Sequence, residues 1–374
     1  MMKSLSIMYA LSGLFLLTGC PGGGDGPGGN FTLGGTAPPV VYTANGGSHT
    51  ISGFTIGAGG VLSPTSPASI ATGGTTSEWV AVSPNGQFLY ASNQGSSNIS
   101  SFTINSATGA LAVTSPATIS AGVGSSPRGI TITPNGQFVY VANSATDTVA
   151  GFSIGVGGVL SATAQGTFPT GGTLARGIAV SPNGQFLYVA NSGSNTVSGF
   201  TIGAAGALAS IGTVSTGAGS SPEGVAISPN GSFLYVVNTG LKEVAAFAIN
   251  GSGNLTALLT PTFSTGTVGA GPQRIVISPN GSFLYVTNTL HNEVARLSIL
   301  TGGLLSTPTA TAGLSTPIGI TINPTGQFLY VANSGNATVA AFTIDGTGAL
   351  TPASPRAITS VGVNPIGIAT PGRP

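Results

Sequence analysis

The amino-acid sequence predicts an all-β protein, a seven-bladed β-propeller with four antiparallel strands in each blade. Three observations predict this fold class. A strand–turn–strand unit recurs seven times, its period suits one four-stranded blade, and the two ends of the chain carry complementary parts of a single blade.

The repeated unit is clearest over residues 177–191, which read GIAVSPNGQFLYVAN. Ile178 and Val180 alternate with small residues and predict a first strand. The Ser-Pro-Asn-Gly stretch predicts a tight turn, because proline fixes its own φ and Asn-Gly tolerates positive φ. The apolar run Phe186–Ala190 predicts a second strand that is covered on both faces.

A tyrosine marks the second strand of every copy, and an asparagine follows each tyrosine by three residues. Successive tyrosines are 48, 50, 48, 47, 50 and 45 residues apart. We expect the asparagines to be structural, capping the backbone of the next loop, because seven equivalent copies argue against one catalytic role. The pairs are Tyr42/Asn45, Tyr90/Asn93, Tyr140/Asn143, Tyr188/Asn191, Tyr235/Asn238, Tyr285/Asn288 and Tyr330/Asn333.

Two further strands complete each copy. The third ends in Phe-x-Ile or, once, Leu-x-Ile; a Gly-rich turn such as 203–206 follows, and then a fourth strand that begins near Leu208 in that copy. Four short strands every 45–50 residues without helical periodicity are typical of a propeller blade. A solenoid of short coils would need a shorter period, and the tryptophan–aspartate and kelch signatures are absent.

The chain ends predict how the ring closes. The first copy begins at Val40 and has no Pro-Asn-Gly strand before it, whereas Pro365–Pro371 reads as a first strand with nothing after it. We therefore expect the C-terminal strand to complete the first blade, which removes the exposed sheet edges. The predicted propeller spans residues 40–374.

The composition argues against nucleic acid as a partner. Charged residues are 4% of the chain, against about 25% in ordinary soluble proteins. The net charge is +1, so the sequence carries no electrostatic footprint for nucleic acid. A free protein with so little charge tends to associate, whereas a tethered one has less need of charge. We expect a monomer.

Residues 1–20 have the layout of a secretory signal, with Lys3 before an apolar run that is too short to span a membrane. The ending Leu-Thr-Gly-Cys resembles a bacterial lipobox, which implies cleavage before Cys20 and lipidation of its sulfur. The alternative is an ordinary signal peptide with a chance cysteine. Cys20 is the chain's single cysteine, so no intramolecular disulfide is expected. Residues 21–39 are rich in Gly and Pro and predict a flexible tether. These features predict a lipoprotein of the bacterial cell envelope, attached to a membrane and facing the periplasm or exterior.

The motif Phe-Leu-Tyr-Val-Ala-Asn after Ser-Pro-Asn-Gly resembles the YVTN-type repeat of the seven-bladed lactonase-like propellers. That family includes 6-phosphogluconolactonases and is common among bacterial surface lipoproteins. The resemblance covers roughly residues 40–371 and implies the fold. It says less about activity, because the repeated residues are the ones that build blades.

Blade topology assigns the charged residues to faces. In a four-stranded antiparallel blade, the start of the first strand and the loop between strands two and three lie at the same end. Nine of the fifteen charged residues (eight Lys and Arg plus seven Asp and Glu) fall there, as do His49 and His291. The nine are Glu78, Arg128, Arg176, Glu223, Arg274, Asp147, Lys242, Glu243 and Glu293. Because the first strand is taken as innermost, its entry residues are expected to ring the mouth of the channel.

The mouth supplies the candidate site. Arg128 and Arg176 on neighbouring blades could grip a carboxylate or phosphate, and a glutamate beside them could act as a general base. The candidate catalytic residues are Glu78, Glu223, Arg128, Arg176 and Arg274, and the candidate ligand contacts are Trp79, Gln273, Lys242 and His291. Two alternatives stay open: these charges pair as structural salt bridges, and Trp79 fills space between blades instead of stacking on a ligand.

The sequence leaves three functions. The first is a binding or interaction module that meets a small molecule or protein at the charged face. The second is a lactone hydrolase of the 6-phosphogluconolactonase-like type, acting on sugar lactones; relatives commonly carry histidine on the approach to the inner strand, but residues 75–79 contain none. The third is a structural envelope component. No cofactor or metal is expected, because no cluster has ligand spacing and the Gly-rich stretches join hairpin strands.

Overall fold

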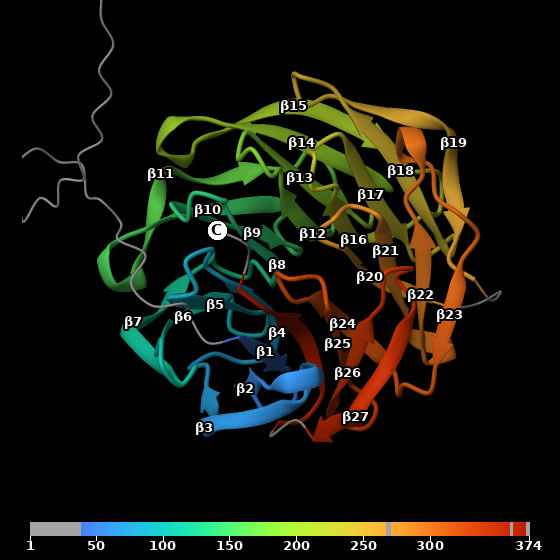
Figure 1. The fold of residues 1–374 in the computed structure, drawn as a ribbon. Helices are drawn as coiled ribbons and strands as arrows, with labels where there is room; N and C mark the ends of the chain where they lie inside the picture. Colours follow the sequence, from blue (N-terminus) through green and yellow to red (C-terminus); the bar gives the residue numbers. More distant parts are fainter. Residues whose placement is uncertain (1–38, 267–270, 360–361, 372–374) are drawn as a thin grey trace, which may run out of the picture. The chain divides into compact units, whose positions relative to one another are not determined.

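The computed structural model describes residues 39–266, 271–359 and 362–371, which form a ring of seven four-stranded antiparallel sheets (Figure 1). The expected signal peptide with Cys20, and the tether up to residue 38, lie outside the described residues. No helix in the described ranges is long and apolar enough to cross a membrane. The helices are short 3₁₀ turns, η1 (Ala58–Gly60), η2 (Val156–Gly158), η3 (Ala204–Gly206), η4 (Thr289–His291) and η5 (Thr301–Gly303).

Each blade runs from an inner strand beside the channel to an outer strand. The inner strands are β4 (Ser77–Val82), β8 (Pro127–Ile132), β12 (Ala175–Val180), β16 (Pro222–Ile227), β20 (Pro272–Ile277), β24 (Pro317–Ile322) and β28 (Pro365–Ala369). The second strands are β1 (Val40–Asn45), β5 (Phe88–Asn93), β9 (Phe138–Asn143), β13 (Phe186–Asn191), β17 (Phe233–Asn238), β21 (Phe283–Asn288) and β25 (Phe328–Asn333).

The third strands are β2 (Thr50–Ile56), β6 (Asn98–Ile104), β10 (Thr148–Ile154), β14 (Thr196–Ile202), β18 (Glu243–Ile249), β22 (Glu293–Ser298) and β26 (Thr338–Ile344). The outer strands are β3 (Leu62–Ala71), β7 (Leu111–Ser120), β11 (Leu160–Pro169), β15 (Leu208–Ser215), β19 (Leu255–Ser264), β23 (Thr309–Ala312) and β27 (Leu350–Thr359). The predicted order of strands within a blade is confirmed.

The ring closes as the sequence predicts. The last strand, β28, pairs antiparallel with β1, so one blade has the order β28-β1-β2-β3. Figure 1 shows the first strands (blue) and the last blade (red) side by side. The Thr43 hydroxyl donates to the Gly367 carbonyl at 3.0 Å and adds a side-chain bond across this closure. The prediction of seven blades, one of them shared by the two ends of the chain, is confirmed.

The turn between the first two strands is built by its own side chains. Ser181 Oγ donates to Asn183 Oδ1 at 2.6 Å and accepts from the backbone N–H of Phe186 at 2.9 Å. Gly184 takes a φ of 72°, the left-handed conformation that favours glycine. This is the turn chemistry that the Ser-Pro-Asn-Gly motif predicts.

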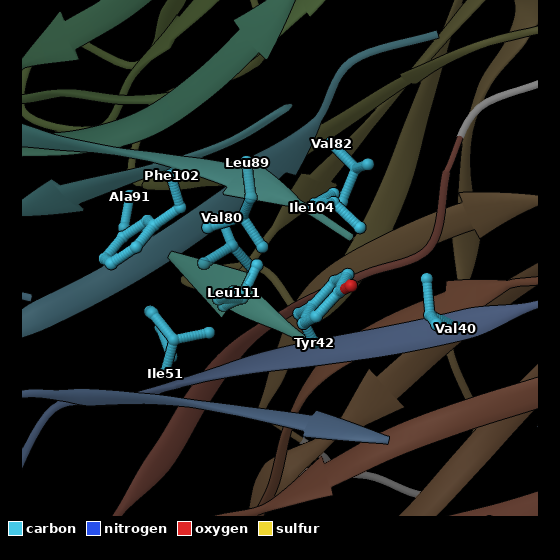
Figure 2. Close-up of a cluster of buried hydrophobic side chains, with 11 residues drawn as sticks. Val40, Tyr42, Ile51, Val80, Val82, Leu89, Ala91, Phe102, Ile104 and Leu111 are labelled. Carbon is cyan, nitrogen blue, oxygen red and sulfur yellow. The ribbon is translucent and has the colours of Figure 1, made fainter. Parts of the chain in front are cut away.

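The hydrophobic core lies between neighbouring blades. Figure 2 shows one of its seven clusters, in which Tyr42 and Ile51 from one blade pack with Leu89 and Phe102 from the next. The seven repeated tyrosines are fully buried. Each donates its hydroxyl to a glycine carbonyl of the following blade, as Tyr188 does to Gly253 at 2.7 Å and Tyr330 does to Gly60 at 3.3 Å across the closure. Burial raises the pKa of all seven phenols.

The repeated asparagines bind differently from the expected loop cap. Asn191 Nδ2 donates to the hydroxyls of Thr196 and Ser198 on the third strand, at 3.2 and 2.6 Å. Asn143 Nδ2 also donates to Ala121 O, in the connection that enters its own blade, at 2.9 Å. The column is structural, as predicted, but it ties a strand and an inter-blade connection together instead of capping the next loop.

Candidate functional site

The inner strands bring five charged side chains together at one end of the channel. Glu78, Arg128, Arg176 and Glu223 each occupy the second position of their inner strand, and Arg274 occupies the third position of β20. We call these five residues the mouth cluster. Because the inner strands of successive blades lie side by side around the channel, positions about 50 residues apart in sequence become neighbours.

Ion pairs join the members of the mouth cluster into two groups. Arg128 Nη1 lies 3.2 Å from Glu78 Oε2. Glu223 is shared, with Oε1 2.7 Å from Arg176 Nη1 and Oε2 3.4 Å from Arg274 Nη1. The five side chains are between 9% and 27% exposed, so they are largely shielded but still reached by solvent. The charged residues therefore pair with one another, which is one of the alternatives that the sequence left open. The same residues also place polar side chains close together at one end of the channel.

Gln94 belongs to this site, although the sequence analysis did not identify it. With its amide nitrogen facing the carboxylate, Gln94 donates to Glu78 Oε1 at 2.9 Å and its oxygen accepts from Arg128 Nη2 at 2.9 Å. It therefore orients both members of one ion pair. One sequence feature could have revealed it: the residue after the repeated asparagine is Gly, Ser or Thr in the other six copies.

Trp79 and Arg274 meet across the channel. The Arg274 guanidinium carbon lies 4.2 Å from the centre of the Trp79 ring, which is a close cation–π contact. Both residues occupy the third position of an inner strand, where the other five blades carry Gly129, Gly177, Gly224, Gly319 and Gly367. Trp79 also packs against the core between β5 and β9, so it both fills space and stacks on a charged group.

The inner glycines are required by close packing between blades. A Cβ atom on Gly177 would overlap the carbonyl oxygen of Glu223 on the next inner strand. The blades of Trp79 and Arg274 carry at one position of the second strand a hydroxyl that bonds a carbonyl of the next inner strand. Ser92 Oγ accepts from Trp79 N at 3.3 Å and donates to the next inner strand at Arg128 O, at 2.5 Å.

Thr287 repeats the arrangement beside Arg274. Its hydroxyl accepts from Arg274 N at 3.1 Å and donates to Ile318 O at 2.8 Å. The other five second strands carry alanine or valine at the position of Ser92 and Thr287, namely Ala44, Ala142, Ala190, Val237 and Ala332. Each bulky residue in the channel is therefore accompanied by a hydroxyl on the neighbouring strand, and the two exceptions to the repeat occur together in both blades.

The other candidates lie outside the mouth cluster. Gln273 precedes Arg274 in β20 and is half-buried, but its side chain makes no polar contact with described residues. Lys242 lies in the β17–β18 loop with an exposed side chain, and His291 lies on η4. Neither contacts the mouth cluster. His49 is structural, because its Nδ1 accepts from Thr76 N at 2.9 Å.

Two other blades carry an accepting side chain at the loop position of His49. Asp147 and Asn195 occupy the equivalent left-handed position and accept through their side-chain oxygens from Leu174 N and Ser221 N, at 2.7 and 2.9 Å. The face that collects these residues thus combines structural loop groups with the mouth cluster. In the described residues, no three His, Cys, Asp or Glu side chains lie close enough to hold a metal ion.

The mouth cluster can bind an anion and move a proton. Three guanidinium groups face two carboxylates, which leaves one positive charge in excess. Burial lowers the pKa of the Arg274 guanidinium, while the negative charges of Glu223 and then Glu78 work against that shift. Guanidinium groups beside a carboxylate suit a reaction in which negative charge develops on an oxygen while a proton leaves a nucleophile.

Comparisons with known proteins agree with the architecture. A family model described as lactonase, seven-bladed β-propeller, matches in three segments, residues 36–167, 157–267 and 258–363. No protein of curated function matches the sequence. A solved structure of a candidate 6-phosphogluconolactonase from Bacteroides uniformis superposes with a TM-score of 0.79 at 22% identity, covering 90% of this chain and 100% of that one.

Two further solved structures are similar. A candidate 6-phosphogluconolactonase from Bacteroides fragilis gives a TM-score of 0.77 at 23% identity, with 89% of this chain and 98% of the other covered. The periplasmic gluconolactonase of Pseudomonas aeruginosa gives 0.69 at 20% identity, with 89% and 98% covered. At this identity the likeness shows the fold alone.

Proposed function

This chain belongs to the lactonase family of seven-bladed β-propellers, and we propose that it hydrolyses lactones at the mouth cluster. The observation that carries the proposal is that Glu78, Arg128, Arg176, Glu223 and Arg274 lie partly shielded in two ion-paired groups, and that the charges of Glu78 and Arg128 in one group act on Arg274 in the other. The sequence alone favours a binding module, which gains no support from the comparisons. Family membership favours lactone hydrolysis instead.

The proposed reaction adds water across the ring ester. The water oxygen attacks the carbonyl carbon as Glu78 accepts a water proton, and the carbonyl oxygen becomes an oxyanion facing the guanidinium groups. The bond from the carbonyl carbon to the ring oxygen then breaks, and the proton passes from Glu78 to that oxygen. The product is an open-chain hydroxy acid, and the enzyme returns to its starting state.

The contacts distinguish the two glutamates. Both Glu223 oxygens are engaged by arginines, so this carboxylate positions Arg176 and Arg274. Glu78 contacts one arginine and the amide of Gln94, which fixes its orientation. We therefore assign proton transfer to Glu78 and oxyanion stabilisation to Arg128 and Arg176. Sugar lactones are the proposed substrate class, because the similar solved structures include two candidate 6-phosphogluconolactonases and a periplasmic gluconolactonase.

Hydrolysis of sugar δ-lactones by the purified protein tests the proposal. Replacing Glu78 by glutamine should lower kcat/KM at least about a hundredfold, since general-base catalysis contributes about 10²–10⁴-fold. Glu223→Gln and Arg176→Ala should also be strongly impaired. Arg356→Gln is the matched control, because Arg356 lies on the outer strand β27 over Phe342 and should leave turnover unchanged. Absence of turnover on every sugar lactone would remove the enzyme proposal.

A second part of the proposal concerns location. We infer from the sequence that Cys20 is lipidated after cleavage and holds the propeller at a membrane of the bacterial envelope. The protein should therefore partition with membranes and incorporate labelled palmitate. Cys20→Ser should abolish both, and a soluble, unlabelled wild-type protein would contradict this part without touching the lactonase proposal.

A further inference from the structure

Asparagine followed by glycine occurs seven times in this chain, and the structure holds one of these glycines differently from the others. In six dipeptides the glycine N–H donates to a backbone carbonyl at 2.8 or 2.9 Å, as Gly184 N does to Ser181 O. In the seventh, Asn250-Gly251, the glycine N–H has no acceptor in the part of the chain that the structure describes. The six bonded glycines are Gly46, Gly86, Gly136, Gly184, Gly231 and Gly281.

The position of the dipeptide within its turn explains the difference. In the repeated Ser-Pro-Asn-Gly turn, glycine is the fourth residue, and its N–H donates to the carbonyl of the first. Asn250 instead begins the turn between β18 and β19, where the Gly253 N–H donates to Asn250 O at 2.9 Å. Gly251 is therefore the second residue of its turn, and a turn of this kind makes no hydrogen bond to the N–H of its second residue.

Water reaches three of the asparagines through one depression of the surface. Asn183, Asn230 and Asn250 all line this depression, which lies between turns of two neighbouring blades and has a volume of about 520 Å³. All three asparagines are exposed. Gly251 is exposed as well, whereas the glycines of the other two dipeptides are half-buried. Access of water to the asparagine therefore does not distinguish the three dipeptides, but the state of the glycine does.

A free glycine N–H beside an asparagine side chain permits a reaction that releases ammonia. The Gly251 nitrogen loses its proton and attacks Asn250 Cγ, the side-chain amide leaves as ammonia, and a succinimide ring forms. Water then adds to one of the two ring carbonyls. Opening at Cγ gives aspartate, and opening at the main-chain carbonyl gives isoaspartate, in which the chain continues through Cγ. Glycine favours ring closure because it has no Cβ to crowd the attacking nitrogen.

We propose that Asn250 is a modification site, at which the folded protein converts asparagine to aspartate or isoaspartate through a succinimide with Gly251. The reaction consumes one water, releases one ammonia and adds one negative charge to the β18–β19 turn. The repeated Ser-Pro-Asn-Gly turns are spared, because attack by their glycine nitrogen requires breaking the hydrogen bond that closes the turn.

The equivalent turn of another blade shows that aspartate fits this position. Asp345 begins the turn between β26 and β27, and its Oδ1 accepts from the N–H groups of Thr347 and Ala349 at 2.8 and 2.9 Å. Asn250 Oδ1 accepts from the N–H groups at the same two positions of its turn, both at 2.9 Å. Hydrogen bonds from the Thr347 hydroxyl and from the two N–H groups hold the pKa of the Asp345 carboxyl below its usual value. The aspartate product should therefore keep the turn intact.

The isoaspartate product should weaken the contact between two blades, because it adds a carbon to the main chain of a closely packed turn. Gly253 O accepts the Tyr188 hydroxyl at 2.7 Å, and a Cβ on Gly253 would overlap Phe186 of the same neighbouring blade. Methyl transfer by an isoaspartyl methyltransferase identifies the isoaspartate form, which should melt at a lower temperature than Asn250→Asp. Asn250→Asp itself should melt like the wild type, and a lower melting temperature would contradict the fit of aspartate in this turn.

One substitution isolates the reacting nitrogen. A Cβ on Gly251 would meet no atom within 4 Å, so Gly251→Ala should fold like the wild type. Its methyl group crowds the attacking nitrogen, and the reaction at Asn250 should slow to a rate similar to that of Asn183. Gly346→Ala is the matched control, because it makes the same change in the turn of Asp345, also without contact within 4 Å, and should leave the rate at Asn250 unchanged. An unchanged rate in Gly251→Ala would overturn the proposal.

Peptide mapping of the aged protein tests the selectivity. The full-length protein is incubated at mildly alkaline pH and digested with pepsin at acidic pH, and mass spectrometry measures the gain of one dalton in each Asn-Gly peptide. In the folded protein, Asn250 should react about tenfold faster than Asn183 and Asn230, whose glycines must first break a hydrogen bond. In concentrated urea, all three should react at similar rates. No gain at Asn250, equal rates in the folded protein, or the same tenfold difference in urea would overturn the proposal.

Discussion

The second strands carry the same tyrosine in every blade, whereas the inner strands of the same blades begin with residues that differ from blade to blade. Along the second strands, seven tyrosines make the same bond to the next blade, from Tyr42 to Gly109 through Tyr330 to Gly60. At the second position of the inner strands, the residues are Glu78, Arg128, Arg176, Glu223, Gln273, Ile318 and Ile366. The second strands therefore repeat one contact in every blade, whereas the residues at the channel mouth differ from blade to blade.

In a repeat protein, residues that depart from the repeat are better candidates for function than residues that recur in every copy. A residue that recurs in every blade serves the interface that every blade shares. Trp79 and Arg274 break the inner-strand glycine pattern, and each comes with a hydroxyl, Ser92 or Thr287, that no other second strand carries at that position. Both departures meet at the channel, where Arg274 of the mouth cluster lies over Trp79.

Alkaline pH should lower the stability of the propeller more than any single substitution below, because it acts on all seven repeated tyrosines. Because burial raises the pKa of all seven tyrosines in the folded protein, the unfolded chain loses its phenolic protons first, near pH 10. Their contribution to stability is complete below that pH and is lost as the pH rises toward the folded values. At pH 11 each tyrosine should lower the free energy of unfolding by about 1 kcal/mol, and the seven together by several kcal/mol. Denaturant unfolding between pH 8 and 11.5 measures this; stability unchanged up to pH 11 would contradict it.

Filling an inner glycine should disturb the packing between neighbouring inner strands. A Cβ on Gly177 meets the Glu223 carbonyl, so Gly177→Ala should lower the free energy of unfolding by about 1–3 kcal/mol. Trp79→Gly restores the glycine of the other blades but removes a side chain that packs against the core between β5 and β9, so it should also lower the free energy of unfolding. Chemical denaturation of both variants compares them. Equal stability of Gly177→Ala and the wild type would mean that the inner strands are not tightly packed.

Removing one repeated hydroxyl should have the smallest effect. Tyr188→Phe leaves the ring in place but deprives the buried Gly253 carbonyl of a hydrogen bond, and should cost about 1 kcal/mol. Tyr235→Phe, which deprives Gly303, should cost a similar amount because the two environments are equivalent. Thermal melts of the two variants test the equivalence. A severalfold difference between them would contradict the view that these positions are interchangeable.

The sequence predicted the architecture because its determinants are local and repeated. The alternation at Ile178 and Val180, the Asn-Gly turn and the spare strand at Pro365 fix the strands, the blade number and the closure. The gathering of the five charged residues also followed, since blade topology places the beginnings of the inner strands around one opening.

The remaining details depend on side-chain directions across the ring. Local patterns could not reveal that Gln94 reaches a neighbouring blade's arginine, or that Arg274 lies over Trp79. Lys242 and His291 were candidates because they share the face, but their loops lie outside the inner strands, and distance from the channel is not encoded in spacing alone.

The central claim is that the mouth cluster serves chemistry and does not hold the ring together. The double variant Glu78→Gln with Arg128→Gln removes both charges of one ion pair together, so neither charge is left buried without its partner. In this variant, lactone hydrolysis should fall at least about a hundredfold while Tm stays within about 2 °C of the wild type. Hydrolysis at the wild-type rate, together with a Tm lowered by about 8 °C or more, would contradict it and identify the cluster as a structural brace.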